Sequence, residues 1–270
     1  MKLVRFRCGN KIGYGVLAGE TVKEGEQVKK VEQIKEIESV KGNLRSFMRG
    51  DFSPTGESYS LEQINLLPPC VPSKVICLGL NYRHHAAEMG LQLPESPIVF
   101  LKPNTCVIGP EDSIKYPRQS RRVDYEAELA VVIGAEASQV EASESLNYVL
   151  GYTCAQDVTA RDLQPKEGQW TYAKGFDTFA PLGPWVETGI KDPESLHISG
   201  YLNGELVQSA PTSDHIFSVS ELIAYISSCM TLLPGDVIMT GTPSGIGPMQ
   251  IGDTFQVEID GVGILCNQIE

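Results

Sequence analysis

The chain has 270 residues, of which 41% are hydrophobic and 21% are charged, as is usual for a large globular domain with room for a small second unit. Its formal charge of −12, with no cluster of basic residues beyond "RQSRR", argues against a nucleic-acid surface. No apolar run approaches the roughly 20 residues that a membrane span needs, and the first residues have no apolar signal core, so we expect a cytoplasmic protein without a membrane partner. The seven cysteines lack paired spacing, which indicates free thiols and neither disulfides nor a zinc site.

Residues 1–70 are predicted to form a small N-terminal domain. "KLVRF" and "IGYGVL" flank a short Cys-Gly-Asn-Lys stretch and predict a hairpin. A charged stretch follows from Lys23 to Lys41. The proline-rich "LLPPCVPSK" predicts a linker into a main domain over residues 71–270.

The main domain is predicted to be rich in strands. "KVICLGL", "SPIVFLK" and "GYTCAQD" predict strands, and the Asn-Gly pair at 203–204 predicts a hairpin. "SVSELIAYISSCM" opens with a capping box from Ser218 to Glu221 and continues with helical spacing, and "VTARDLQ" predicts the start of another helix. Many strands with few helices favour an α+β, mainly β architecture.

An acidic cluster lies in "RRVDYEAELAVVIG", residues 121–134. Asp124, Glu126 and Glu128 alternate with apolar residues, so a strand would project the three carboxylates from one face. The run from Leu129 to Ile133 continues as a buried strand would. Such acids most often form a solvated face. The alternative is a site for a hard cation such as Mg²⁺, Mn²⁺ or Ca²⁺, which would offset the repulsion among the carboxylates.

"NYRHHAAEMG", residues 81–90, contains a histidine and a carboxylate three residues apart. On a helix His85 and Glu88 would share a face and could hydrogen-bond, either as a surface pair or as a general base acting on water. Tyr82 is compatible with simple packing.

Two further stretches are weaker signals. Lys174, in "WTYAKGFDTFAPLGPWV", is by default a surface lysine, but in a cleft it would suit an enolate or carboxylate oxygen. A cleft lysine has little packing to lose, so its replacement is expected to leave stability unchanged. In "TGTPSGIG", residues 240–247, the loop amides and the Thr242 hydroxyl could face an anion, although a plain turn is equally compatible.

Taken together and in this order, these stretches resemble the fumarylacetoacetate hydrolase family. The resemblance runs from about Ser73 to the end of the chain and is loose before that. The matching segments are "GLNYRHHAAEMG", "PIVFLKPNT", "RRVDYEAELAVVIG", "GYTCAQDVTARDLQ", "AKGFDTFAPLGPWV", "NGELVQSAPTSDHIFSVSELIAYIS" and "LLPGDVIMTGTPSGIG".

The resemblance implies a mixed β-sandwich roll with a small N-terminal domain, usually as a homodimer. It implies Mg²⁺ or Mn²⁺ held by an E-x-E pair and a distant aspartate, here Glu126, Glu128 and Asp157. The same resemblance implies that His85 and Glu88 activate water. In the family the lysine that matches Lys174 contacts the substrate. We also assign Tyr82, Arg161 and Thr242 to substrate binding.

These residues predict a metal-dependent enzyme for a small anionic substrate. The leading hypothesis is a hydrolase or decarboxylase of a β-keto 2-oxo acid of the acylpyruvate or oxaloacetate type, acting through an enolate stabilised by the metal. The alternative is an isomerase or hydratase of 2-hydroxymuconate or 2-oxo-dienoate compounds in aromatic catabolism. The intact residue set disfavours a non-catalytic binding protein. Three ligand carboxylates and one divalent ion leave one net negative charge, so an anionic substrate needs a further cation nearby, for which Lys174 is the candidate and Arg161 a helper.

Overall fold

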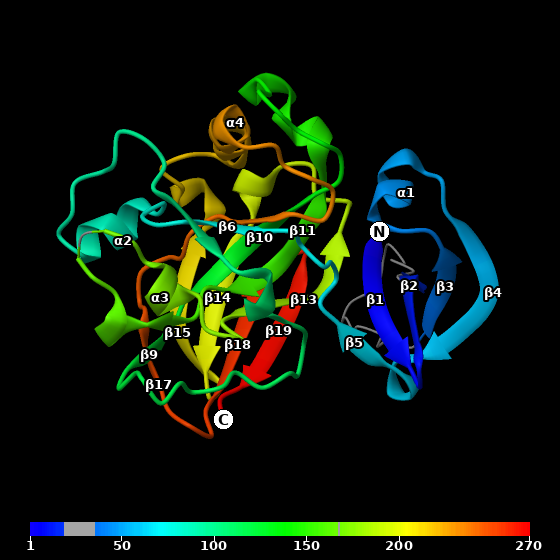
Figure 1. Cartoon of the computed structure of the whole chain (residues 1–270), viewed down its shortest axis with the longest axis horizontal. Helices are drawn as coiled ribbons and strands as arrows, with labels where there is room; N and C mark the ends of the chain where they lie inside the picture. Colours follow the sequence, from blue (N-terminus) through cyan, green and yellow to red (C-terminus); the bar gives the residue numbers. More distant parts are fainter. Residues whose placement is uncertain (19–35, 167) are drawn as a thin grey trace, which may run out of the picture.

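The computed structural model describes residues 1–18, 36–166 and 168–270. The structure is mainly β with few helices, which confirms the predicted fold class. In Figure 1 the N-terminal strands and α1 (Leu44–Arg49) gather on one side, and α4 (Val219–Cys229) lies along the outside of the larger part. Residues 23–35 of the predicted charged stretch lie outside the described residues. Within the described ranges, no helix has the length and apolarity to cross a membrane.

One mixed sheet of 12 strands runs through both parts of the molecule. Its order is β4-β3-β2-β1-β13-β11-β10-β16-β6-β7, with β5 beside β1 and β8 beside β13. The strands are β1 (Lys2–Cys8), β2 (Lys11–Ala18), β3 (Glu36–Lys41), β4 (Ser53–Ser60), β5 (Asn65–Leu67), β6 (Val75–Leu78), β7 (Val99–Lys102), β8 (Val107–Ile108), β10 (Ala127–Ile133), β11 (Val149–Gln156), β13 (Ala180–Glu187) and β16 (Val237–Met239). β1 and β2 form the predicted N-terminal hairpin. Because β1 also pairs with β13, the N-terminal strands continue the same sheet, and the domain boundary at residue 70 stays a prediction.

The sheet that packs against β10 and its neighbours has four strands in the order β15-β14-β18-β19. These are β14 (His197–Leu202), β15 (Glu205–Pro211), β18 (Thr254–Ile259) and β19 (Gly263–Gln268). Leu129, Val131 and Ile133 of β10 belong to the core cluster that contains residues of this sheet. Ala130 and Val132, on the opposite face, pack in a second cluster that includes α1. β10 is therefore buried on both faces, as its apolar run predicts, and rigidly holds the carboxylates at its start.

Two local predictions are confirmed. Asn203 and Gly204 adopt φ values of 52° and 83° and close the hairpin between β14 and β15. Both residues tolerate positive φ, which an Asn-Gly hairpin turn requires. α4 begins after Ser218 with the predicted capping box, in which Ser218 and Glu221 each satisfy a backbone amide of the other.

Two other predictions are wrong in detail. The strand predicted from Asp124 onward is interrupted at Glu126, so that β9 (Val123–Tyr125) belongs to a small separate sheet with β12 (Thr159–Ala160) and β17 (Gly247–Met249). The helix predicted in "VTARDLQ" is absent from these described residues. Its first residues pair with β9 as β12, and only a 3₁₀ turn, η4 (Arg161–Leu163), follows. Long-range strand pairing thus overrides the local helical signal.

Candidate active site

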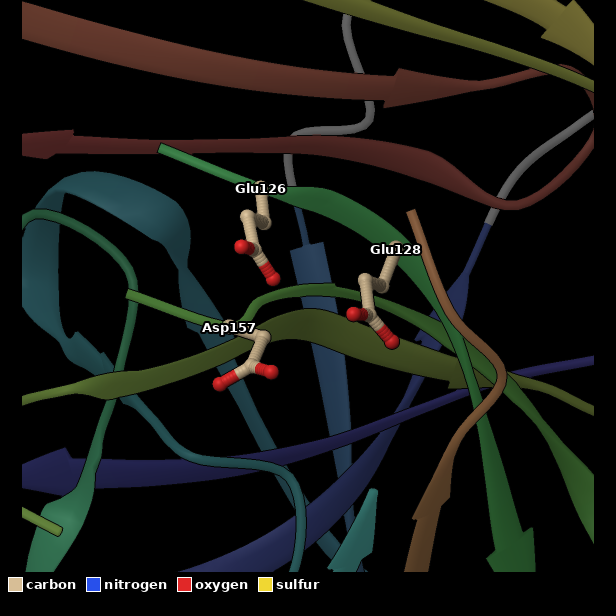
Figure 2. Close-up of side chains that lie close together, drawn as sticks. All are labelled: Glu126, Glu128 and Asp157. Carbon is tan, nitrogen blue, oxygen red and sulfur yellow. The ribbon is translucent and has the colours of Figure 1, made fainter. Parts of the chain in front are cut away.

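Three buried carboxylates converge where β10 and β11 lie side by side. Glu126 precedes β10, Glu128 lies within it, and Asp157 follows β11. The two strands are antiparallel, and the Asp157 amide donates to the Glu126 carbonyl at 3.0 Å, which places Asp157 opposite the Glu pair. One oxygen from each carboxylate lies within 4.8 Å of the others, and Figure 2 shows the three side chains close together. The structure therefore brings together the three residues predicted as metal ligands.

Positive side chains surround this carboxylate cluster. The Lys174 ammonium group donates to Glu126 Oε2 at 2.8 Å and to Asp157 Oδ2 at 2.6 Å. Lys102 Nζ pairs with Asp157 Oδ1, and Arg161 Nη2 pairs with Glu126 Oε1. The Lys174 side chain is only 3% exposed, so the default expectation of a surface lysine is wrong.

The pKa values of the two glutamates in this cluster shift in opposite directions. Burial acts to raise the pKa of Glu126, but Lys174 and Arg161 outweigh it and lower this pKa to about 2. For Glu128, burial and the neighbouring Asp157 and Glu126 charges raise the pKa well above its usual value. Glu128 Oε2 accepts the Gly241 amide at 2.7 Å, whereas Oε1 is buried without a partner among the residues described. Such a group is unfavourable unless another positive charge approaches it.

These observations match the requirements of a hard divalent cation. The donor atoms are all carboxylate oxygens, which Mg²⁺ and Mn²⁺ prefer. The unpartnered Glu128 Oε1 is a free ligand atom, and each carboxylate oxygen has two lone pairs, so the hydrogen bonds from lysine and arginine leave room for a metal bond. Glu126, Glu128 and Asp157 thus form a candidate metal-binding set.

Asp124 has a different role from its neighbours. It is fully buried, and its carboxylate accepts from Arg122 Nε at 2.8 Å and from Arg161 Nε at 2.9 Å. Arg161 therefore bridges Asp124 and the ligand candidate Glu126 through different guanidinium nitrogens. Arg161, which we assigned to substrate binding, orients carboxylates in this structure.

The predicted histidine–glutamate pair is present on α2 (Arg83–Glu88). His85 Nδ1 lies 3.0 Å from Glu88 Oε2, and His85 is largely buried. This contact assigns Nδ1 to Glu88 and leaves Nε2 for a substrate or a water. The Gly245 amide donates to both Glu88 oxygens, at 3.2 and 3.3 Å, so the glycine-rich loop contacts this pair.

The remaining predicted binding residues are both buried. The Thr242 hydroxyl accepts from Gln208 Nε2 at 2.9 Å, which leaves its hydrogen free to donate. Tyr82 packs in the core, with its ring 4.7 Å from that of His215, and its hydroxyl is without a partner in the described part of the chain. Burial, followed by the charge of Glu128, raises the pKa of Tyr82 well above its usual value, so Tyr82 remains a neutral donor.

Two residues of the site have no counterpart in the sequence analysis. Lys102 is fully buried at the end of β7, where it contacts Asp157 and donates to the Val158 carbonyl at 3.0 Å. Gln208 lies on β15 and accepts the Ala127 amide at 2.9 Å, between the two glutamates. A lysine that directly follows an apolar strand run is a usable signal, because such a lysine needs a partner if it is buried. Gln208 offers no comparable local signal.

Comparison with known proteins adds independent support. The family described as Fumarylacetoacetate (FAA) hydrolase C-terminal matches residues 74–270, which is most of the chain. The chain belongs to the fumarylacetoacetate hydrolase family. A second family, described as Rv2993c-like, N-terminal, matches residues 1–69. The predicted family membership is thereby confirmed.

Relatives within the fumarylacetoacetate hydrolase family differ in their reactions. The mitochondrial oxaloacetate tautomerase Fahd2a of Rattus norvegicus is 44% identical over 77% of this chain and 70% of its own. The structure of 5-carboxymethyl-2-hydroxymuconate delta-isomerase from Mycobacterium smegmatis is 38% identical, with a TM-score of 0.87 over 100% of this chain and 99% of that one. Maleylpyruvate hydrolase from Sphingobium sp. SYK-6 is 30% identical, with a TM-score of 0.78 over 100% and 99%. The chain is thus a member of an enzyme family whose reactions include tautomerisation, isomerisation and hydrolysis.

Proposed function

We propose that this chain is a divalent-metal-dependent enzyme that interconverts the keto and enol forms of a small 2-oxo dicarboxylate of the oxaloacetate type. The observation that carries the proposal is the buried set of Glu126, Glu128 and Asp157, with an unpartnered carboxylate oxygen and a surrounding shell of cations. The names of the rat tautomerase and the mycobacterial isomerase support a reaction of this kind, since both describe proton rearrangement in related compounds.

The charge balance favours a substrate with two negative charges. The connected groups are four carboxylates and four cations: Asp124, Glu126, Glu128, Asp157, Arg122, Lys102, Arg161 and Lys174. With all four carboxylates ionised, a divalent ion would leave the cluster with two positive charges. The net charge of −1 expected from the sequence counted only the three ligand carboxylates and the ion, whereas the structure adds Asp124 and the four cations. A dianion restores neutrality, and the remaining negative charge of the protein acts only at longer range.

Bound at the three carboxylates, a divalent ion would act as a Lewis acid toward the 2-oxo oxygen and make the neighbouring carbon acidic. In the keto-to-enol direction His85 Nε2 takes the proton from that carbon while the 2-oxo oxygen gains a proton, and in the reverse direction the enol oxygen loses its proton while His85 returns one to the carbon; Glu88 holds the imidazole through Nδ1. Lys174 uses two of its three N–H groups on Glu126 and Asp157 within the described structure, so the third can donate to the developing oxyanion. Thr242 offers its hydroxyl hydrogen to a substrate carboxylate.

A second candidate, hydrolysis of an acylpyruvate, is favoured by the His85–Glu88 contact itself. A histidine oriented by a carboxylate suits a general base that activates water for attack on the C4 carbonyl. Decarboxylation, in contrast, needs the electron sink but no attacking water. Hydrolysis and decarboxylation would therefore use the same site as tautomerisation. The three reactions differ in what His85 does.

The test compares reactions side by side with Mg²⁺ or Mn²⁺. Proton exchange at C3 of oxaloacetate is followed by NMR in D₂O, together with its decarboxylation and with hydrolysis of acetylpyruvate. We expect exchange well above the rate in buffer that depends on the metal, and exchange at the buffer rate in Glu126→Gln. If the metal-loaded protein accelerates none of the three reactions, the proposal is wrong. If only acetylpyruvate turns over, the hydrolase replaces the tautomerase.

A further inference from the structure

The loop that follows β16 contacts both halves of the candidate site. At one end the Gly241 amide donates to Glu128 Oε2 at 2.7 Å. At the other end the Gly245 amide donates to the Glu88 carboxylate at 3.2 and 3.3 Å. Four residue steps separate the two glycines, so their amides are at most about 14 Å apart. The metal-ligand candidates and the histidine pair are thus linked through one short segment of backbone.

Two buried amide side chains, those of Gln208 and Asn81, hold this loop in place. Gln208 Nε2 donates to Thr242 Oγ1 at 2.9 Å and to the Pro243 carbonyl at 2.8 Å, while its Oε1 accepts the Ala127 amide. Asn81 Nδ2 donates to the Thr240 carbonyl at 2.7 Å. Because these bonds tie the loop to β10 and to the residues before α2, the loop cannot shift freely relative to either.

Gly245 occupies a position that other residues fit poorly. Its φ is +94°, and a Cβ added there would lie 2.2 Å from the Val207 carbonyl oxygen, which is backbone and cannot turn aside. Only glycine adopts this conformation without strain and without moving the chain away from β15. Glycine at 245 therefore keeps the amide directed at Glu88.

We propose that Gly245 is a positioning residue for the proposed reaction: its amide fixes the Glu88 carboxylate against His85 Nδ1 and so sets the direction of His85 Nε2. Gly245 itself does not contact the reacting atoms and acts through Glu88. The role in turnover rests on the proposed function, in which His85 moves the proton. The contact between Gly245 and Glu88 can be measured without any substrate.

The kinetic test compares Gly245→Ala with Gly252→Ala. Gly252 has a nearly identical φ of +96°, but an added Cβ there meets no atom within 4 Å, so this control carries the same backbone strain without the clash. Losing a hydrogen bond to a carboxylate predicts a fall in kcat of about 10- to 100-fold for Gly245→Ala. We expect KM and metal affinity to stay within about twofold, and Gly252→Ala to keep wild-type kcat.

A double variant separates positioning from general damage. If Gly245 acts through Glu88, then Gly245→Ala introduced into Glu88→Ala causes no further loss of kcat. An independent additional loss would overturn the proposal, because it would show that the loop acts by some other route.

The substrate-free test is amide hydrogen exchange in Glu88→Ala. The Glu88 side chain is 42% exposed, so its truncation is compatible with folding. We expect faster exchange at the Gly245 amide, with unchanged exchange at the Gly252 amide, which donates to Ile269. Unchanged exchange at Gly245 would overturn the inference whatever the activity. Faster exchange at Gly245 in a protein that turns over no 2-oxo acid would support the contact and refute the proposed function instead.

Discussion

Replacing Lys174 by methionine removes the ammonium group from the centre of the candidate site and keeps a chain of similar length. The lost contacts are those to Glu126 at 2.8 Å and to Asp157 at 2.6 Å, and both partners are buried. The lysine nitrogen also lies 5.2 Å from the centre of the Phe100 ring, so the methionine side chain enters a partly apolar environment. The change therefore acts mainly on charge.

The structure predicts a loss of stability, in contrast to the unchanged stability that the sequence leads us to expect for a lysine in a cleft. Removing one partner of a buried ion pair typically costs about 3 to 5 kcal/mol. Since Lys102 and Arg161 still pair with Asp157 and Glu126, we expect the lower end, about 3 kcal/mol, in chelator. A bound divalent ion restores positive charge at the same carboxylates. Saturating metal should therefore stabilise Lys174→Met more than it stabilises the wild type.

The effect on turnover follows from the same geometry. Removing a preorganised donor to a developing oxyanion costs at least about 100-fold in kcat/KM, or about 2.7 kcal/mol of transition-state stabilisation. Steady-state kinetics with oxaloacetate and denaturant unfolding, each with Mg²⁺ and with chelator, measure both effects. Lys115→Met, at an exposed position, is the matched control and should resemble the wild type. Wild-type kcat/KM together with unchanged unfolding in chelator would show that Lys174 stabilises neither the carboxylates nor the oxyanion.

Two further predictions use other parts of the structure. His85→Ala should slow proton transfer by about 10²- to 10⁴-fold without weakening metal binding. His197→Ala, which removes a side-chain contact with Ser209, is the control and should keep the wild-type rate. Equal losses in both variants would remove His85 from the mechanism. Burial of the Asp236 carboxyl group acts to raise its pKa. Hydrogen bonds from the Lys74 and Ser73 side chains outweigh this effect and lower the pKa below its usual value. This carboxylate therefore stabilises the fold above its unfolded pKa of about 4, and that contribution is lost as the pH falls below it. Asp236→Asn should cost about 2 kcal/mol at pH 7 and progressively less toward pH 3 in urea unfolding, and a constant difference would contradict the assignment.

The sequence predicts those features of the fold that depend on neighbouring residues. The Asn203-Gly204 turn and the capping box of α4 are set by backbone preferences within a few residues. The buried strand after Glu128 follows from its apolar run. The clustering of Glu126 and Glu128 follows from their spacing, whereas the addition of Asp157 depended on resemblance to a family.

The features that the sequence misses depend on contacts between distant segments. Lys102 at the end of β7 meets Asp157 after β11 although three strands of the sheet separate β7 from β11, and the residues around Lys102 do not indicate which carboxylate it meets. Arg161 turns toward Asp124 and Glu126 because β12 pairs with β9, the same pairing that replaces the predicted helix. The resulting charge balance of the site therefore required the structure.

Metal binding by Glu126, Glu128 and Asp157 is the property on which every step of the proposed reaction depends. Titration of Mn²⁺ into chelator-treated protein, followed by electron paramagnetic resonance, measures it without any substrate. We expect one ion per chain in the wild type and binding weaker by more than about 100-fold in Glu128→Gln, which replaces the carboxylate that has a free buried oxygen. The exposed Glu57→Gln should bind as the wild type does. Absence of binding to the wild type, or equal binding to Glu128→Gln, would show that these carboxylates are not the metal site.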